Sequence, residues 1–395
     1  MSYLSNSAAP VPDVVCFSHL RWNFVFQRPN HLMTQCARDR RVFFIEEPVW
    51  AEAGGSGVIR RGGELEVRLA GPQLYLVTPR LLRGRDAPSC QRQLLQQLYD
   101  QYGIGEPIHW FYTPMALEFA RELPSRLTIY DCMDELSAFR GAPPALQLLE
   151  RELFERAEVV FTGGRSLYEA KSPLHPNVHL FPSSVDVEHY STARQPLPDP
   201  ADQAAIARPL LGYFGVIDER LDHQLIERIA RERPSWSLVM LGPIVKVDPR
   251  SLPRLPNIHY LGQKSYEELP SYLAGWQVAL MPFALNEATR FISPTKTLEY
   301  LAGGKAVVST AIRDVVSPYA ERGLVQVAEP DEFVAAIERA LSGQAVPRRA
   351  DVDAWLARSS WQQTWSEMAG LIERALRSRA SRDKRKGAQA RAAID

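Results

Sequence analysis

The stretch Arg290-Phe-Ile-Ser-Pro-Thr-Lys-Thr-Leu-Glu-Tyr-Leu-Ala-Gly-Gly-Lys-Ala-Val-Val-Ser309 joins an expected helix start to a short apolar strand. Ser293 is expected to cap the helix and Pro294 to be its first residue, which puts Lys296 at the third helical position. The partial positive charge of a helix start opposes a lysine by about 0.3 to 1 kcal/mol unless an anion lies between them. A bound phosphate would supply that anion.

Glu299 follows Lys296 by three residues and therefore lies on the same helix face. Its carboxylate is then placed to accept hydrogen bonds from hydroxyls of a sugar attached to the phosphate. The alternative is an exposed helix on which Lys296 and Glu299 form a surface ion pair. The two interpretations stay open on this motif alone.

Length and charge restrict the class of protein. With 395 residues the chain exceeds the size of a single core, and its 45% hydrophobic residues are enough for two. Lys plus Arg equals Asp plus Glu at 46 each, which gives no overall field for binding nucleic acid. No apolar run approaches the roughly 20 residues of a spanning helix, so a cytoplasmic protein is expected. The cysteines and histidines show no zinc spacing, and no metal site is predicted.

Short apolar runs alternate with helical patterns along the whole chain, which favours parallel sheets with crossover helices, an α/β fold. We expect two doubly wound Rossmann-like domains facing across a cleft, with ligands beyond the carboxyl ends of the strands. The expected divisions are a first domain at 1–195, a Pro-, Ala- and Asp-rich linker at 196–209, a second domain at 210–350, a helical segment at 351–376 and a basic, disordered tail at 377–395.

Two of the strand-end loops carry chemistry. The loop that begins at Gly215 allows close approach of a ligand, and its Arg220, near a helix start, is suited to gripping a diphosphate. The alternative is an ordinary turn with solvated charges. After Tyr130, Asp131 and Asp134 lie close together with a third acid, and repulsion among them would raise a pKa and create a general base. The alternative is that one aspartate caps a turn.

The first strand is followed by a connection in which Trp22, Arg28 and His31 crowd together. Arg28, before a helix-starting proline, is suited to an anion, and Trp22 to stacking on a sugar ring. The alternative is that the aromatic groups fill the base of the domain and that the histidine has a structural hydrogen bond. No GxGxxG occurs there, which counts against a dinucleotide cofactor.

These motifs together resemble the GT-B glycosyltransferases, in particular bacterial family-1-type, teichuronic-acid and exopolysaccharide sugar transferases. The resemblance extends over nearly the whole chain and is most specific in Ser293–Tyr300 and Gly303–Val308. It implies that the segment binds a nucleotide-sugar donor, with the lysine at the diphosphate and the glutamate at hydroxyls. The donor-binding residues expected on this basis are Gly215, Arg220, Thr295, Lys296 and Glu299.

One departure from the family pattern concerns the donor sugar. Many retaining relatives carry a second glutamate eight residues before the one that matches Glu299, and here that residue is Phe291. Asn286 and Glu287 are the nearby substitutes. Whether the reaction retains or inverts the anomeric configuration therefore does not follow from the resemblance.

The expected function is transfer of a sugar from a nucleoside-diphosphate sugar to an acceptor hydroxyl, in cell-surface polysaccharide or glycolipid synthesis, with Asp134 or Asp131 as the base and no cofactor or metal. Trp22, Arg28 and His31 are the expected acceptor contacts. The acceptor would be a saccharide or a lipid-linked group. Eight basic residues after Leu371 suggest peripheral contact with an anionic membrane at its inner face. The alternatives are a nucleotide-sugar 2-epimerase and a non-catalytic nucleotide-sugar-binding subunit.

Overall fold

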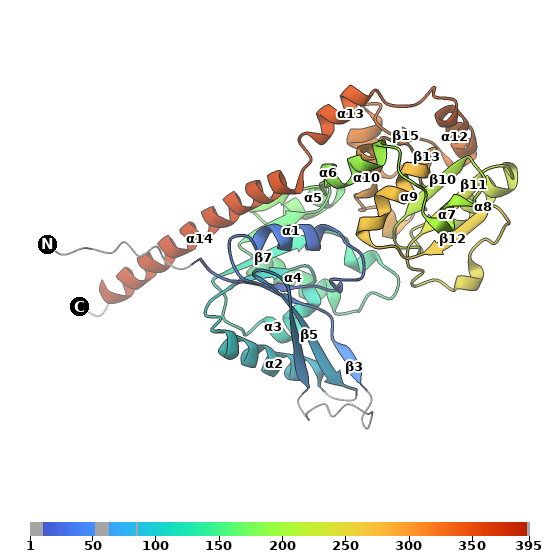
Figure 1. Ribbon diagram of the computed structural model, residues 1–395. Coiled ribbons are helices and arrows are strands. Elements are labelled where there is room, and N and C mark those ends of the chain that lie inside the picture. Colours follow the sequence, from blue (N-terminus) through green and yellow to red (C-terminus); the bar gives the residue numbers. More distant parts are fainter. Residues whose placement is uncertain (1–10, 52–62, 84–85, 393–395) are drawn as a thin grey trace. The chain divides into compact units, whose positions relative to one another are not determined.

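The computed structural model of the chain describes residues 11–51, 63–83 and 86–392 (Figure 1). The chain forms two compact units. The first comprises residues 1–131, 145–161 and 365–395, and the second comprises residues 132–144 and 162–364.

This division differs from the expected boundaries. The segments 132–144 and 162–195 belong to the second unit, although the sequence pattern assigns them to the first. The chain leaves the first unit at the end of one strand, at Asp131, and the C-terminal helix returns to it. Local patterns locate most of the strands, but which unit a connecting segment packs against depends on tertiary contacts.

The sheet of the first unit is almost entirely parallel. Its strands are β1 (Val14–Phe17), β2 (Val42–Ile45), β3 (Val49–Ala51), β4 (Glu64–Gly71), β5 (Leu74–Leu82), β6 (Ile108–Phe111), β7 (Leu127–Cys132) and β8 (Val159–Thr162). In the sheet their order is β3-β5-β2-β1-β6-β7-β8, and β9 (Val178–Leu180) pairs next to β8. The six strands from β5 to β8 follow the doubly wound pattern 3-2-1-4-5-6. The predicted parallel α/β architecture is confirmed in this unit.

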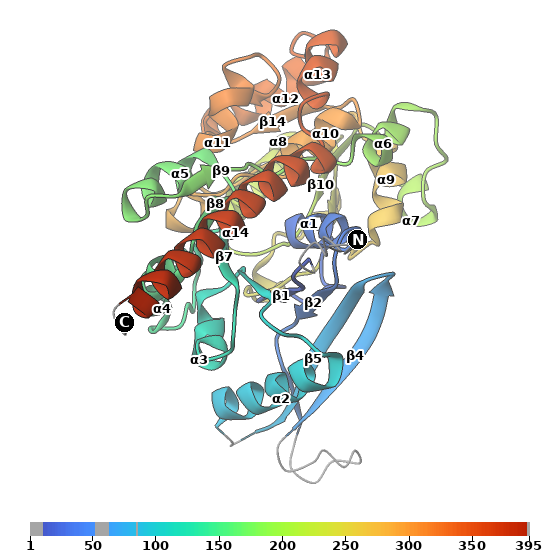
Figure 2. The same cartoon turned by 90° about the vertical axis from the view of Figure 1, so that its left-hand side faces the viewer.

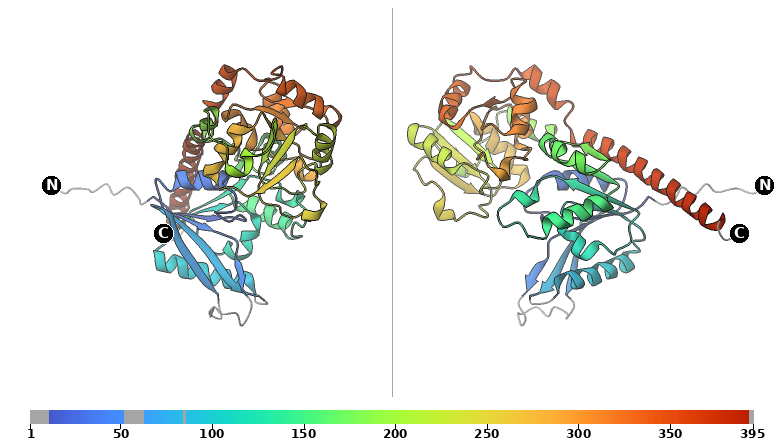
Figure 3. Two further views of the ribbon diagram at one scale, coloured as in Figure 1. Left: turned by 45° about the vertical axis from the view of Figure 1, so that its right-hand side comes forward. Right: turned by 180° about the vertical axis from the view of Figure 1, so that it is seen from behind.

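An antiparallel hairpin, β4 with β5, was not predicted (Figure 3). Most β4 side chains are exposed or half-buried, so the strand has no continuous apolar run in its sequence. The helices of this unit are α1 (Arg28–Cys36), α2 (Ala87–Tyr102), α3 (Leu117–Ala120) with the 3-10 turn η1 (Pro114–Ala116), and α4 (Leu146–Arg156). Asp86 caps α2 by accepting from the Ser89 amide, and Gly103 ends the helix at φ +60°.

The second unit is built in the same way. The strands of its sheet are β10 (Leu210–Phe214), β11 (Ser237–Leu241), β12 (Ile258–Gly262), β13 (Val278–Met281), β14 (Ala306–Ser309) and β15 (Gln326–Val327). The order β12-β11-β10-β13-β14-β15 is again 3-2-1-4-5-6, as expected for a doubly wound sheet. The strand order reverses between β10 and β13, so the crevice beyond their carboxyl ends is where a ligand is expected.

Helices connect these strands. They are α5 (Arg165–Lys171), α6 (Val187–Ser191), α7 (Ala201–Ala204), α8 (His223–Glu232), α9 (Leu269–Gly275), α10 (Lys296–Ala302), α11 (Arg313–Val315), α12 (Phe333–Leu341) and α13 (Arg349–Leu356). Short turns are η2 (Leu136–Ala138), η3 (Ser172–Leu174), η4 (Thr192–Arg194), η5 (Pro249–Ser251), η6 (Tyr266–Glu268), η7 (Glu287–Thr289), the π-helical η8 (Val316–Ala320) and η9 (Pro330–Glu332). Asp222 caps α8, whose apolar side packs in the core of this unit.

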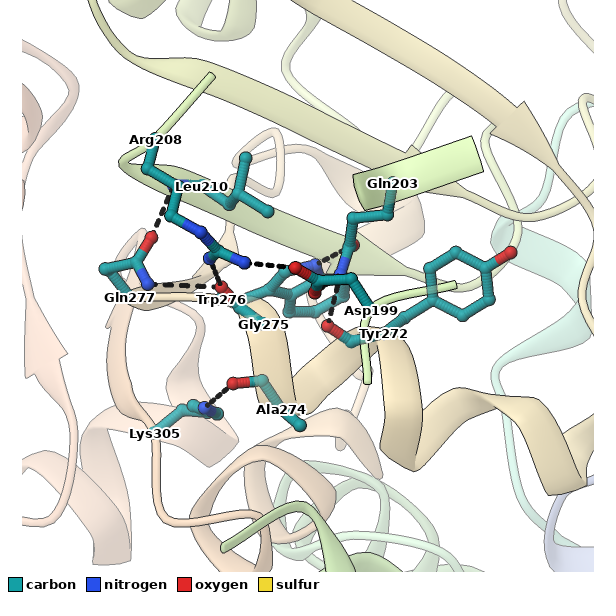
Figure 4. Close-up of polar contacts among 10 residues, drawn as sticks. All are labelled: Asp199, Gln203, Arg208, Leu210, Tyr272, Ala274, Gly275, Trp276, Gln277 and Lys305. Atoms are coloured by element: carbon teal, nitrogen blue, oxygen red, sulfur yellow. Dashed lines mark hydrogen bonds and ion pairs between the residues drawn. The ribbon is translucent and has the colours of Figure 1, made fainter. Parts of the chain in front are cut away.

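The expected linker, 196–209, belongs to the second unit, and its Asp199, Gln203 and Arg208 have polar contacts there (Figure 4). It contains α7, and Gln203 is fully buried there. The indole nitrogen of Trp276 donates to the Gln203 side-chain oxygen at 2.9 Å. Arg208 forms an ion pair with Asp199 beside this contact. A Pro-rich composition therefore marks an irregular but fixed segment here, because its polar side chains have buried partners.

The C-terminal helix α14 (Trp361–Ala392) is a single long helix (Figure 2). Its first turns bury Trp361 and Trp365. Residues 377–392 are helical where a disordered tail was expected, and 393–395 lie outside the described residues. Arg379 pairs with Glu158 at 2.5 Å, which fixes part of the basic segment to the first unit and gives a reason for its order. In the part of the chain that the structure describes, no helix is both long and apolar enough to cross a membrane.

Candidate functional site

Three segments of the second unit meet at the carboxyl ends of β10 and β11. Gly215 has φ +139°, and a side chain on it would overlap the end of the Lys296 side chain. Gly242, also at φ +139°, lies so close to Gly215 that a Cβ would overlap the carbonyl oxygen of Gly215. These two glycines are therefore required for close approach as well as for backbone conformation. The predicted neighbourhood of Gly215 and Lys296 is present in the structure.

The loop after β10 holds Arg220 in a fixed position. Its guanidinium donates to the Asp218 carboxylate at 2.7 to 3.1 Å, and Asp218 is almost completely buried. The guanidinium carbon also lies 5.5 Å from the centre of the Phe139 ring. Lys246, from the loop after β11, places its ammonium 4.9 Å from the same ring. Two cations thus share one aromatic side chain.

Helix α10 starts later than the sequence suggests. It begins at Lys296 after Thr295, which has helical backbone angles and makes no side-chain capping bond. The expected cap at Ser293 and helical start at Pro294 are wrong, because the preceding residues form a turn in which the Thr297 amide donates to the Pro294 carbonyl at 3.2 Å. Lys296 is still at the helix start, and its ammonium lies 5.8 Å from the Tyr213 ring centre.

Glu299 is buried on the inner side of α10. This excludes the alternative of an exposed surface pair with Lys296. Burial raises the pKa of Glu299 to about 7, against the opposing effects of Lys296 and of a hydrogen bond from the Tyr190 hydroxyl. Burial likewise lowers the pKa of Lys296, and Glu299 opposes that change. Near neutral pH this carboxyl group can both accept and donate hydrogen bonds.

Asp134 lies in the segment 132–144, which belongs to the second unit. Burial raises the pKa of Asp134 to about 6, although nearby Arg220 and Lys296 lower it. Lys246 also lowers it, and Asp218 adds to the rise. A carboxylate with this pKa is largely ionised at pH 7 and able to take a proton, as a general base must.

Asp131 has a different environment, which counts against the predicted role as a base. Its carboxylate is fully buried and accepts from the Arg28 guanidinium at 2.9 and 3.1 Å. Arg28 is itself only 1% exposed, so this pair joins α1 to the end of β7 within the first unit. The predicted acceptor contact of Arg28 is therefore not supported, because its side chain is enclosed by protein. The sequence could not show this pairing of residues far apart in the chain.

The other two predicted acceptor residues are partly exposed. Trp22 stacks edge-on against Phe44 at 5.1 Å between ring centres, and its amide donates to Glu46 at 2.8 Å. His31 packs edge-on against Phe26 at 4.7 Å. These contacts fit the structural alternative, and the acceptor role stays a prediction.

The two nearby substitutes for the glutamate at the Phe291 position also have other contacts. The side chain of Glu287 is 78% exposed and lies 3.6 Å from Arg290. The Asn286 side chain accepts from the Thr289 amide at 3.2 Å. Neither has the buried environment of Glu299.

The sequence analysis singled out neither Lys246 nor Phe139. Its alternative of an ordinary turn with solvated charges is wrong for Asp218, which is buried. An aspartate two residues before an arginine is a common surface pattern, so its burial has no local signal. Lys246 is a single lysine in a Pro- and Asp-containing loop, and only the fold places it beside Arg220. Within the described ranges, 11–51, 63–83 and 86–392, no group of three or more His, Cys, Asp or Glu side chains could hold a metal ion.

Known proteins are similar to this chain in sequence and in fold. Residues 208–343 match the family model of glycosyl transferases group 1. The Bacillus subtilis (strain 168) protein TuaH, named for glycosyl transfer in teichuronic acid biosynthesis, is 28% identical over 268 residues, which is 63% of this chain and 67% of that protein.

Solved structures match over almost the entire chain. Sucrose-phosphate synthase from Thermosynechococcus elongatus has a TM-score of 0.66 at 14% identity and covers 93% of this chain and 100% of its own. The Escherichia coli structure described as trehalose-6-phosphate bound with UDP-2-fluoro glucose has a TM-score of 0.64 at 12% identity. The match covers 92% of this chain and 99% of the Escherichia coli chain. The WaaG glycosyltransferase of lipopolysaccharide biosynthesis has a TM-score of 0.62 at 12% identity, and the match covers 91% of this chain and 99% of WaaG. The resemblance to GT-B glycosyltransferases is confirmed at the level of the fold, and residues 208–343 are similar to the group 1 glycosyl transferases.

Proposed function

We propose that the protein transfers a sugar from a nucleoside-diphosphate sugar to an acceptor hydroxyl. The observation that carries this proposal is the meeting of Arg220, Lys296 and Asp134 around Gly215, at the switch point of the second sheet. Two cations beside a backbone without a side chain suit a diphosphate, which can approach closely and pair with both. Thr295, directly before Lys296, would donate to the same group.

In the proposed reaction the acceptor oxygen forms a bond to the anomeric carbon of the sugar, and the bond from that carbon to the diphosphate oxygen breaks. The nucleoside diphosphate leaves with the bonding electrons, and Arg220 and Lys296 stabilise its added negative charge. Asp134 takes the proton of the acceptor hydroxyl. Because the two cations perform the charge stabilisation, the proposed reaction requires neither a metal nor a cofactor besides the sugar nucleotide.

Glu299 is proposed to bind hydroxyl groups of the donor. It lies one turn into α10 from Lys296, and the Tyr190 hydroxyl already donates to it. A buried carboxylate that lacks a hydrogen-bond partner raises the free energy of the complex. Glu299 should therefore bind a donor that offers it a hydroxyl group much more tightly than an analogue without that group. Ribose hydroxyls and sugar hydroxyls both satisfy it, and a series of deoxy donors would distinguish them.

The acceptor is proposed to be a saccharide or lipid-linked group in cell-surface polysaccharide or glycolipid synthesis. The names of TuaH and WaaG support this class, because they refer to teichuronic acid and to lipopolysaccharide. Trp22 and His31 are the acceptor contacts proposed in the first unit. A cytoplasmic enzyme bound peripherally to the inner face of the membrane would reach a lipid-linked acceptor.

Helix α14 supports the peripheral association. Five of its basic side chains are exposed: Arg374, Arg377, Arg382, Lys384 and Arg385. Each contributes about 1 kcal/mol of attraction near an anionic surface, and salt screens this attraction over about 8 to 10 Å. Sedimentation with anionic vesicles should therefore show binding that falls sharply as salt rises. Replacing Arg377, Arg382 and Arg385 by Gln keeps the helix and should release the protein, whereas equal binding by this variant would exclude a role for the helix charges.

The function itself is tested by incubating the full chain with UDP-, GDP- and dTDP-sugars, with and without saccharide acceptors. Acceptor-dependent release of nucleotide is the expected result. Isomerisation of the sugar without acceptor would instead indicate a 2-epimerase. Binding without turnover would indicate a nucleotide-sugar-binding subunit, which the phenylalanine at position 291 makes a specific alternative.

A further inference from the structure

The loop after β11 is joined to the donor loop after β10 by backbone hydrogen bonds. The Ile217 amide donates to the Pro243 carbonyl at 2.9 Å, and the Val245 amide donates to the Ile217 carbonyl at 3.1 Å. Ile217 and Ile244 form a parallel bridge beyond the ends of the strands. The two loops therefore continue the pairing of β10 with β11 beyond the ends of the strands, and Lys246 follows shortly after Ile244.

Lys246 has an unusual backbone conformation. Its φ is +60°, and within the described part of the chain it is the one residue other than glycine with a positive φ. The left-handed region is unfavourable for lysine because of its Cβ, and glycine or asparagine would be preferred there. Because Lys246 is exposed, burial of its side chain does not compensate for the conformational free energy of this backbone strain. A strained residue at a ligand-binding edge points to a functional requirement for its side chain.

The side chain of Lys246 is directed to the Phe139 ring, at 4.9 Å from its centre, and Arg220 lies 5.5 Å from the same centre. A cation over an aromatic face gains about 0.5 to 1 kcal/mol at an exposed site, yet two cations on one ring repel each other. An anion with two negative groups would relieve that repulsion, because each cation could pair with one of them. A diphosphate has this arrangement.

We propose that Lys246 is a further diphosphate-binding residue of the donor site, which acts together with Arg220, and that the Phe139 ring positions the two cations. The inference rests on the proposed function and names a contact that the sequence motifs do not contain. It also links the segment 132–144, which carries Asp134 and Phe139, to the leaving group. Loss of the ring would misplace both cations without removing either charge.

The test measures binding of inorganic pyrophosphate and of UDP, GDP and dTDP to the full chain by calorimetry. Lys246→Met should weaken binding of pyrophosphate and of the preferred nucleoside diphosphate about tenfold, and Lys246→Arg should restore most of it. Arg250→Met is the matched control, since Arg250 lies on the same loop, is 92% exposed and pairs only locally with Asp248. It should bind as the wild type does.

A purely structural role of Lys246 is distinguished by Lys246→Gly. Glycine accepts the left-handed conformation, so this variant should be at least as heat-stable as the wild type without ligand and still lose about tenfold in affinity. Phe139→Leu should weaken binding about threefold, and its effect should be smaller in the Lys246→Met background. Additive effects of the two changes would overturn the positioning role of the ring.

The outcomes separate this inference from the proposed function. If the wild type binds pyrophosphate or a nucleoside diphosphate and Lys246→Met binds within twofold of it, the inference is overturned and the proposed function stands. If Arg250→Met is weakened as much as Lys246→Met, loop charge in general is responsible, and the inference is again overturned. If the wild type binds none of the four probes, the proposed function fails as well.

Discussion

The buried carboxyl group of Glu299 should make the stability of the protein depend on pH, and Glu299→Gln should remove that dependence. The folded-state pKa is raised from 4.5 to about 7. Below pH 4.5 the group is mostly neutral in both the folded and the unfolded state, so its burial does not lower the free energy of unfolding. As pH rises from 4.5 to 7 the unfolded chain loses the proton first, so stability is lost over this window and stays lower above it.

The magnitude follows from the same values. The difference between 4.5 and about 7 is roughly 2.5 pH units, and each is equivalent to about 1.4 kcal/mol, so the loss is about 3 kcal/mol. Because Gln has no charge to bury, the free energy of unfolding of Glu299→Gln minus that of the wild type should increase by about 3 kcal/mol between pH 4.5 and pH 8. The contribution of Asp134 is present in both proteins and cancels in this difference.

Urea unfolding followed by tryptophan fluorescence at several pH values measures the difference. Glu287→Gln is the control, because Glu287 lies on the same stretch of chain and is 78% exposed. Its difference from the wild type should stay constant over the pH range. A change of less than about 1 kcal/mol for Glu299→Gln would refute the reasoning, since it would mean that the carboxylate ionises in the folded state without a burial cost.

Three further predictions concern the same site. Lys296→Ala should weaken nucleotide-sugar binding by about 1.5 to 3 kcal/mol, which is the range for hydrogen bonds to charged groups. The melting temperature of this variant should stay close to that of the wild type. Unchanged affinity in calorimetry would show that Lys296 is not part of the donor site. Asp134→Asn should lower turnover about a hundredfold or more while donor binding stays intact. Turnover of the wild type should fall about tenfold per pH unit below about pH 6, because Asp134 becomes protonated there. A variant with near-normal turnover would exclude Asp134 as the base. Gly242→Ala should destabilise the protein by more than about 2 kcal/mol in thermal denaturation, because the added Cβ would overlap the Gly215 carbonyl. Gly323→Ala is the control: no atom lies within 4 Å of its added Cβ, so it should lose only the conformational strain of about 1 kcal/mol. Equal losses of stability in the two variants would contradict the close approach of Gly242 to Gly215.

The sequence by itself determined the class of fold and most of the elements that build it. Apolar runs of four or five residues, such as Val14–Phe17 and Leu210–Phe214, have a signal that does not depend on their neighbours, because a strand buried on both faces must be apolar throughout. The alternation of such runs with helical patterns then restricts the topology to doubly wound sheets. The hairpin strand β4 has one exposed face and a mixed composition, and it was missed.

Part of the site was also determined locally. Gly215, Lys296 and Glu299 were predicted from a glycine after a strand and from the spacing of two charges, and the structure brings them together as proposed. The spacing of Lys296 and Glu299 is local, whereas the approach of Lys296 to Gly215 needs the folded chain, and donor binding by these residues stays a prediction. The start of α10 was misplaced by about two residues, since the turn before it forms similar backbone hydrogen bonds.

Only the tertiary structure decided which charges are buried and paired. Asp131 and Asp134 are three residues apart and look equivalent in sequence, yet Arg28 neutralises the first in the interior of one unit, while the second faces the cations of the other. The same holds for Lys246, whose loop pairs with the loop that carries Arg220 and whose ammonium lies beside the Phe139 ring. Burial and ion pairing depend on partners about a hundred residues away in the chain. No local pattern contains that information, because the free energy of a charge is set by the groups that surround it in the folded protein.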